Sequence, residues 1–178
     1  MIDRKHLEGF DIMRRMSPAI IQALTEHGEE KVVQAGGVVL EQGAPAEKLY
    51  GLIEGEVELC FIFKDHILRS DVQHEESVVR WWETVDTSIV LDTLDPGDLL
   101  GWSAMTGGET YTATVICTVE SRVWAVSGDF LRSLLDDDPA MGYMFMDYMA
   151  KLIAGRLSRK THKLVESWAE AFGSSRVV

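Results

Sequence analysis

The chain has 178 residues, 46% of them hydrophobic and 26% charged, a composition typical of folded globular proteins and not of disordered ones. This length predicts one domain, with a core large enough to need no metal or disulfide. The net charge of −12 at pH 7 argues against DNA or RNA as a partner, because binding to a phosphate backbone depends on Lys and Arg displacing counterions.

The amino terminus has no apolar signal-peptide core, and no run of about 18 apolar residues could span a membrane. We therefore expect a soluble, cytoplasmic protein that does not bind membranes. Cys60 and Cys117 lie far apart in apolar, strand-like runs, without the spacing of a metal site. They are interpreted as buried thiols in a reducing compartment.

The first strong helix signal lies between Ser17 and Gly28. Ser17 is a favourable N-cap, Pro18 suits the first helical position, and Gly28 is a common helix end. Residues 1–28 are therefore predicted to form the N-terminal helical part of the domain.

From Val32 the chain changes to short β-like runs separated by glycine, which predicts an antiparallel barrel or roll over residues 29–127. Within the run EVELCFIF, alternate positions are strongly apolar and are predicted to form one face against the core. These positions are Val57, Leu59, Phe61 and Phe63.

Polar and aromatic residues in the middle of the chain predict two long strands, 56–73 and 78–94, joined by a turn at 74–77. Two interpretations stay open for Trp81 and Trp82 within them. The strands extend past the barrel without a special role, or the two indoles cover a pocket or a partner subunit.

The register of the predicted hairpin, 56–94, follows from the position of its turn. In that register Cys60 lies near Leu91, and Ile62 lies near Ile89.

The C-terminal part, 128–173, is predicted to be helical, with a short helix followed by one that begins at Pro139 and runs for more than 30 residues. Apolar residues recur along the long helix at spacings of three, four or seven, with a break near Lys160 and Thr161. They are Met146, Met149, Ile153, Leu157, Leu164 and Trp168. Because a helix of this length overruns one small barrel, the stripe predicts a homodimer formed through it.

The order of these parts resembles the cyclic-nucleotide-binding domain family, as in catabolite activator proteins and the regulatory subunits of kinases and channels. The resemblance rests on the glycine-rich turns in 32–59, LDPGDLLGWSAM at 94–105, YTATV at 111–115 and RLSRKT at 156–161. It implies a mainly β fold over 1–178: an eight-stranded, jelly-roll-like antiparallel β-roll with N-terminal helices and a long C-terminal helix.

The resemblance also implies a ligand site. In the family, backbone N–H groups at the start of a short cassette helix face the cyclic phosphate, which suits the positive end of a helix dipole. A glutamate holds the ribose and an arginine pairs with the phosphate. The corresponding candidate ligand-binding residues here are Gly101, Trp102, Ser103, Ala104, Tyr111, Thr112, Ala113 and Thr161.

Two of these positions depart from the family pattern: Trp102 stands at the glutamate position and Tyr111 at the arginine position. We therefore predict a degenerate cassette that binds no ligand or a non-standard, nucleotide-like or small aromatic one, with no cofactor. Thr161 could still contact a base, while Lys160 is interpreted as a solvated lysine.

The predicted way in which the module acts on its target differs from that of catabolite activator proteins, because only about ten residues follow Trp168. No helix-turn-helix fits there, so we expect a sensor module that acts through its dimer or through a separate effector protein. A purely structural, dimeric interaction module is one alternative.

The other alternative is a cupin-like, metal-dependent enzyme. Its histidines would be drawn from a scattered set without metal-ligand spacing, so no catalytic residue and no metal ligand is predicted. The set is His6, His27, His66, His74 and His162.

Overall fold

A computed structural model describes residues 1–74 and 77–172, with side chains described at all of these except 68–81 and 172. The chain forms two compact units. One contains residues 1–29 together with the chain from Val126 onward, and the other contains residues 30–125. Each unit is described by itself.

The first unit is helical. Its elements are α1 (Arg4–Leu7), the 3₁₀ helix η1 (Met13–Arg15), α2 (Pro18–His27), α4 (Gly128–Asp137) and α5 (Pro139–Phe172). The predicted cap of α2 is confirmed, because the Ser17 hydroxyl accepts a hydrogen bond from the amide of Ile20 and Gly28 follows the last helical residue. The prediction of a helix of more than 30 residues from Pro139 is confirmed as well.

The second unit holds the strands. They are β1 (Glu29–Val33), β2 (Val38–Leu40), β3 (Lys48–Glu54), β4 (Val57–His74), β5 (Ser77–Leu94), β6 (Leu99–Leu100), β7 (Thr114–Cys117) and β8 (Ser121–Ser127), with the short helix α3 (Ser103–Thr106) after β6. They form two four-stranded sheets in the orders β1-β8-β3-β6 and β2-β7-β4-β5. This arrangement confirms the predicted fold class, an eight-stranded antiparallel roll with flanking helices.

A hydrophobic cluster fills the roll and draws on both sheets. It contains aliphatic side chains such as Leu52, Val57 and Val115, together with the two phenol rings of Tyr50 and Tyr111. Buried aliphatic and aromatic surface of this kind is the main source of folding free energy. Tyr111, a predicted ligand-site residue, is thus part of the core.

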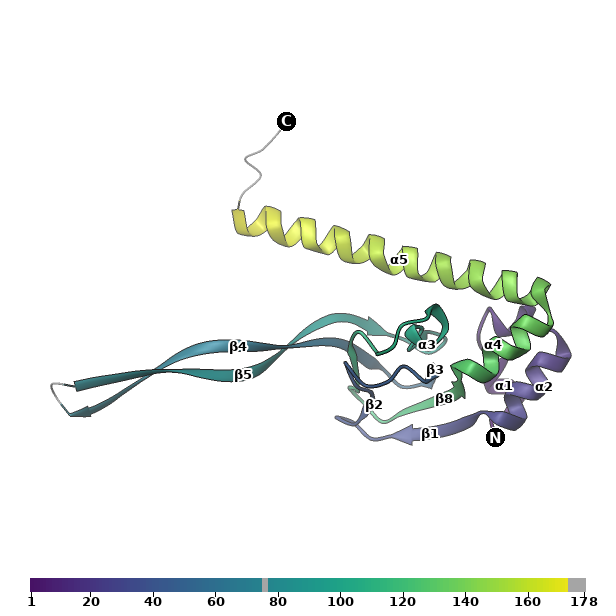
Figure 1. Ribbon diagram of the computed structural model, residues 1–178, viewed down its shortest axis with the longest axis horizontal. Coiled ribbons are helices and arrows are strands. Elements are labelled where there is room, and N and C mark those ends of the chain that lie inside the picture. The colour runs from purple at the N-terminus through teal and green to yellow at the C-terminus, as the bar shows by residue number, and fades with distance from the viewer. Residues whose placement is uncertain (75–76, 173–178) are drawn as a thin grey trace, which may run out of the picture. The chain divides into compact units, whose positions relative to one another are not determined.

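Strands β4 and β5 form a long two-stranded ribbon that extends past the other strands (Figure 1). The predicted hairpin is confirmed, with His74 paired to Ser77; residues 75 and 76 of the predicted turn lie outside the described residues. Trp82 in the ribbon is exposed, and the Trp81 side chain lies outside the described set.

The predicted register of the ribbon is wrong by one residue along most of its length. Cys60 pairs with Val90 instead of Leu91, and Ile62 pairs with Ser88 instead of Ile89. The reason is a β-bulge opposite Leu59 and Cys60: Leu59 pairs with Asp92 and Cys60 with Val90, so Leu91 is an extra residue on β5.

The predicted apolar face of β4 is confirmed only at the start of the strand, because pairing with β7 ends at Cys60 and β4 continues as one strand of the two-stranded ribbon. Val57, before the bulge, is fully buried as predicted. After it, Cys60 is buried, with 2% of its surface exposed, whereas Phe61 is 42% exposed. Burial raises the pKa of the Cys60 thiol, which keeps it in the unreactive neutral form. Cys117 is also a buried free thiol, as predicted.

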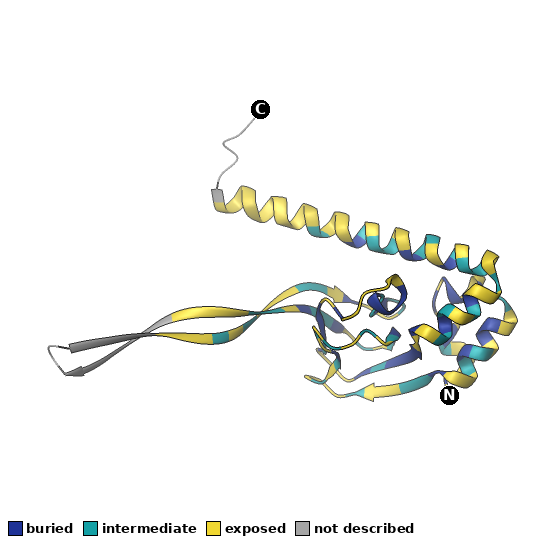
Figure 2. Cartoon of the chain, viewed as in Figure 1, coloured by how far each residue is buried: buried dark blue, intermediate teal, exposed yellow. Residues whose placement is uncertain are grey.

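Helix α5 changes character along its length (Figure 2). In its first half Phe145 and Met149 are buried within the helical unit. In its second half Leu157, Leu164 and Trp168 are 65%, 60% and 63% exposed. Of the predicted apolar stripe, Met149 is buried and Ile153 half-buried, and the other members, Met146 included, are exposed. No helix in the described chain is long and apolar enough to cross a membrane.

Candidate ligand site

The cassette begins with a glycine that no other residue could replace without strain. Gly101 follows β6 and has φ +70°, in the left-handed region. A Cβ atom there would lie 2.9 Å from the Lys48 carbonyl oxygen and 3.1 Å from Cε1 of Tyr111. Gly101 therefore allows the chain to pass directly against β3 and the Tyr111 ring.

The short helix α3 follows Trp102 and packs inward. Ser103, Ala104 and Met105 are buried, and Gly107, with φ +77°, ends the helix. The amide of Ala104 donates to the Gly101 carbonyl oxygen at 3.1 Å, so it is engaged inside the turn. Trp102 is half-buried at the start of the helix.

Tyr111 occupies the position at which the resemblance places an arginine. Its side chain is 6% exposed. Its hydroxyl donates to the Lys48 carbonyl oxygen at 2.8 Å and accepts from the Lys48 amide at 3.0 Å. Burial is the main cause that raises the pKa of Tyr111 to about 12. The phenol is therefore a neutral group that joins the loop before β7 to the start of β3.

Backbone hydrogen bonds fix the chain on both sides of this ring. The Tyr111 amide donates to the Ala44 carbonyl oxygen, and the Gly43 amide donates to the Tyr111 carbonyl oxygen, both at 2.9 Å. The main chain at Tyr111 is thus fixed by two hydrogen bonds, and displacement of the ring would break the two that its hydroxyl makes to Lys48.

The remaining predicted residues differ in exposure. Thr112 is exposed and Ala113 is buried. Thr161 lies on α5, in the helical unit, where its hydroxyl donates to the Leu157 carbonyl oxygen at 3.0 Å. The other seven predicted residues all lie between positions 101 and 113 of the β unit.

Sequence reasoning missed two residues that support this region. Lys48 contributes its backbone to Tyr111, and Gln42 donates its backbone amide to the hydroxyl of Thr114 at 3.0 Å. The Gln42 side chain also bonds the backbone of Ile62 in both directions. These partners are 20 to 72 residues apart in sequence, so no local pattern indicates them.

The electrostatics of the loop do not favour an anion. Residues 101–113 contain no Arg or Lys, and Glu109 is the single charged residue among them. Within the described part of the chain, no group of three or more His, Cys, Asp or Glu side chains could hold a metal ion. The loop offers hydroxyl groups, aromatic rings and an apolar floor.

The chain is similar to one protein family and to several solved structures. The family model for the cyclic nucleotide-binding domain matches residues 76–138, a range that includes the cassette and Tyr111. No curated protein compared with the chain matches it.

Several solved structures have the same fold. A Geobacter metallireducens GS-15 protein assigned to the cyclic nucleotide-binding proteins is 24% identical, with a TM-score of 0.63, and the match covers 88% of this chain and 99% of that one. A cyclic nucleotide-binding domain from Methylobacillus flagellatus KT is 16% identical (TM-score 0.68; 93% and 85% covered). The sensor domain of the transcriptional regulator DNR from Pseudomonas aeruginosa is 17% identical (TM-score 0.59; 83% and 91% covered).

The chain therefore has the fold of the cyclic nucleotide-binding class, whose family model matches residues 76–138, and the resemblance predicted from its sequence is confirmed. Domains of this class are typically non-catalytic regulatory modules. At the level of the class, the prediction of a regulatory module is confirmed.

Proposed function

We propose that the chain is a regulatory module of the cyclic nucleotide-binding class whose cassette does not bind cyclic AMP. The observation that carries the proposal is the buried Tyr111 ring, which packs against Gly101 and bonds both backbone groups of Lys48. By the resemblance, a cationic arginine would stand at this position.

The energetics support the proposal. A phosphate in the cassette would lack a charge-assisted hydrogen bond, which contributes about 1.5–3 kcal/mol. A ligand that displaced the Tyr111 ring would also leave Lys48 backbone groups unsatisfied, at a further cost of about 1–3 kcal/mol. Both costs apply to any anionic cyclic nucleotide.

The direct test is calorimetric titration of the protein with cyclic AMP and cyclic GMP. We expect no binding by the wild-type chain at micromolar nucleotide. Trp102→Glu combined with Tyr111→Arg restores the two family side chains and is expected to bind cyclic AMP measurably. Thr112→Arg adds the same charge at the exposed neighbouring position and is the matched control, expected not to bind. Micromolar affinity of the wild type for cyclic AMP would contradict the proposal.

A non-standard ligand is the second form of this function, and the half-buried Trp102 at the start of α3 supports it, since an indole offers a stacking surface. A ligand present at a hundredfold excess over its Kd stabilises the fold by about 2.7 kcal/mol. A thermal-shift screen over nucleotides, cyclic dinucleotides and small aromatic compounds would detect it. A hit should lose its effect in Trp102→Ala if it binds at the cassette.

We further propose that the module acts as a homodimer through α5, on its own or with a separate effector protein. Tyr143, Leu157 and Leu164 are exposed large side chains separated by multiples of seven residues, and Trp168 lies one turn beyond them. An apolar stripe of this length is stable in water when another helix covers it.

Sedimentation measurements test the dimer. Leu157→Glu combined with Leu164→Glu places two carboxylates in the stripe and should give a monomer at concentrations where the wild type is dimeric. Ser158→Glu, exposed on the same helix but outside the stripe, is the control and should leave the dimer intact. A monomeric wild type at tens of micromolar would overturn the dimer proposal.

A further inference from the structure

A cavity lies among the N-terminal helices of the helical unit. It measures about 410 Å³ and is lined by residues of α1, η1, α2 and the segments that join them. This volume falls within the range of small-molecule sites, about 300–1,000 Å³. All of its lining residues belong to the helical unit.

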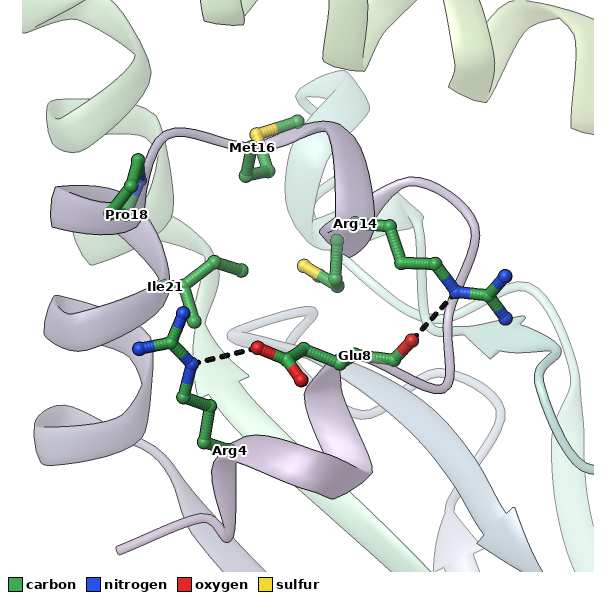
Figure 3. A pocket seen from close by; sticks show the side chains of 7 residues that line it. Arg4, Glu8, Arg14, Met16, Pro18 and Ile21 are labelled. Carbon is green, nitrogen blue, oxygen red and sulfur yellow. Dashed lines mark hydrogen bonds and ion pairs between the residues drawn. The ribbon is translucent and has the colours of Figure 1, made fainter.

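One wall of the cavity is a guanidinium held in a fixed orientation. Nε of Arg4 donates to Oε1 of Glu8 at 2.7 Å. The two terminal nitrogens of Arg4 have no partner within the described part of the chain. In Figure 3 they lie beside Ile21, at the edge of the open space. The ion pair with Glu8 thus leaves the two-pronged end of the guanidinium available.

The second arginine that lines the cavity, Arg14, bonds the backbone that follows α1. Nε of Arg14 donates to the Glu8 carbonyl oxygen at 2.8 Å, and one of its terminal nitrogens donates to the Gly9 carbonyl oxygen at 3.3 Å. Its guanidinium points away from the open space (Figure 3). Arg14, which also pairs with Asp11 at 3.7 Å, therefore fixes the Glu8 backbone without occupying the cavity.

The rest of the lining is apolar. Met13, Met16 and Ile21 are buried, and Pro18 begins α2 beside them. Methionine side chains are flexible and polarisable, so they adapt to the shape of a small apolar group and contact aromatic rings favourably. The cavity therefore combines a cationic edge with an adaptable apolar wall.

The charged groups of the lining indicate which class of ligand the cavity would bind. Each lining arginine has a carboxylate partner, Glu8 for Arg4 and Asp11 for Arg14, so the terminal nitrogens of Arg4, and not an excess of charge, favour an anionic ligand. A planar guanidinium with two free terminal nitrogens matches a carboxylate in bidentate geometry. We propose that this cavity binds a small organic monocarboxylate, with its carboxylate on Arg4 and its apolar body against Met13 and Met16.

The test uses ¹³C-labelled methionine methyl groups and benzoate as the probe. Benzoate should shift the Met13 and Met16 methyl signals in a saturable manner, because its ring current acts at short range. Benzamide, a neutral molecule of nearly the same shape, and acetate, which lacks the ring, should each bind at least tenfold more weakly. Equal affinity for benzamide and benzoate would overturn the proposal.

The matched variants are Arg4→Gln and Arg15→Gln. Arg4 and Arg15 are both exposed and both lie within the first 15 residues, but of the two only Arg4 lines the cavity. Arg4→Gln should weaken benzoate binding at least tenfold, as expected for the loss of a charge-assisted hydrogen bond, while Arg15→Gln should change it by less than twofold. Arg4→Lys, which keeps the charge without the fork, should lie between them.

Two outcomes count against the site. Equal weakening by the Gln variants would show a non-specific cationic patch, and unchanged Met13 and Met16 signals at millimolar benzoate would show no binding. The methyl group of Met105, buried in α3, reports on the cassette separately. A shift confined to Met105 would therefore overturn this proposal and support a ligand at the cassette instead.

Discussion

The cassette and the second half of α5 use their aromatic and aliphatic residues in opposite ways. At the cassette, Tyr111 lies buried against Gly101 with its hydroxyl bonded to the main chain of β3. Along α5, Leu157, Leu164 and Trp168 expose most of their surface. The apolar surface of the cassette is buried within the chain, whereas that of the second half of α5 is exposed to solvent.

This difference decides what each region contributes to the stability of the isolated chain. A closed cassette contributes to folding stability, because its contacts are made whether or not a ligand is present. An exposed stripe contributes nothing to the isolated chain and gains free energy only when a partner covers it. Substitutions in the two regions should therefore affect different measurements.

The largest effect is expected at Gly101. Gly101→Ala combines a positive φ with a Cβ placed 2.9 Å from a backbone oxygen, so it should lower the free energy of unfolding by about 2–4 kcal/mol. Gly107→Ala is the matched control, since it has φ +77° but no heavy atom within 4 Å of the added Cβ. It should cost about 1–2 kcal/mol. Urea denaturation measures both; equal losses would show that the cassette is not closely packed.

Tyr111→Phe keeps the ring and removes the hydroxyl. Two hydrogen bonds to Lys48 are lost, and the free energy of unfolding should fall by about 1–3 kcal/mol. Tyr143→Phe, at an exposed tyrosine of α5, should change stability by less than about 0.5 kcal/mol. A negligible effect at Tyr111 would mean that its hydroxyl does not join the cassette to β3.

The raised pKa of Tyr111, about 12, predicts a specific alkaline response. The unfolded chain loses the phenolic proton near pH 10, whereas the native chain retains it. The stabilisation from this group is therefore complete below about pH 10 and is lost as the pH rises through about 12. The stability difference between wild type and Tyr111→Phe should narrow across that window, measured by denaturation at fixed pH values. A stability difference between wild type and Tyr111→Phe that does not change with pH would refute this prediction.

The smallest effect is expected at Leu164. In dilute protein Leu164→Ala should change the free energy of unfolding by less than about 0.5 kcal/mol, because the side chain is exposed. If α5 forms a dimer, the wild type gains stability as concentration rises and the variant gains less. Thermal unfolding over a hundredfold range of concentration tests this. If the wild type and Leu164→Ala showed the same dependence on concentration, Leu164 would not be part of a dimer interface.

Much of the fold was predictable because its signals are local. The cap at Ser17, the end of α2 at Gly28 and the glycine-rich turns of the roll depend on residues within a few positions of one another. Alternation along the strands indicated the antiparallel class, and the order of the turn signatures indicated the domain family. Those features follow from the amino-acid sequence by itself.

The tertiary structure decided what depends on distant residues. The bulge opposite Leu59 and Cys60 adds Leu91 to β5 and shifts the register of the ribbon, and Phe61 is exposed although the alternation in the sequence predicted that it faces the core. Likewise the resemblance predicted that Tyr111 stands at an arginine position, but only the fold showed that its hydroxyl bonds Lys48, 63 residues away. Packing between such distant segments depends on the whole arrangement of strands, and for that reason no local pattern determined it.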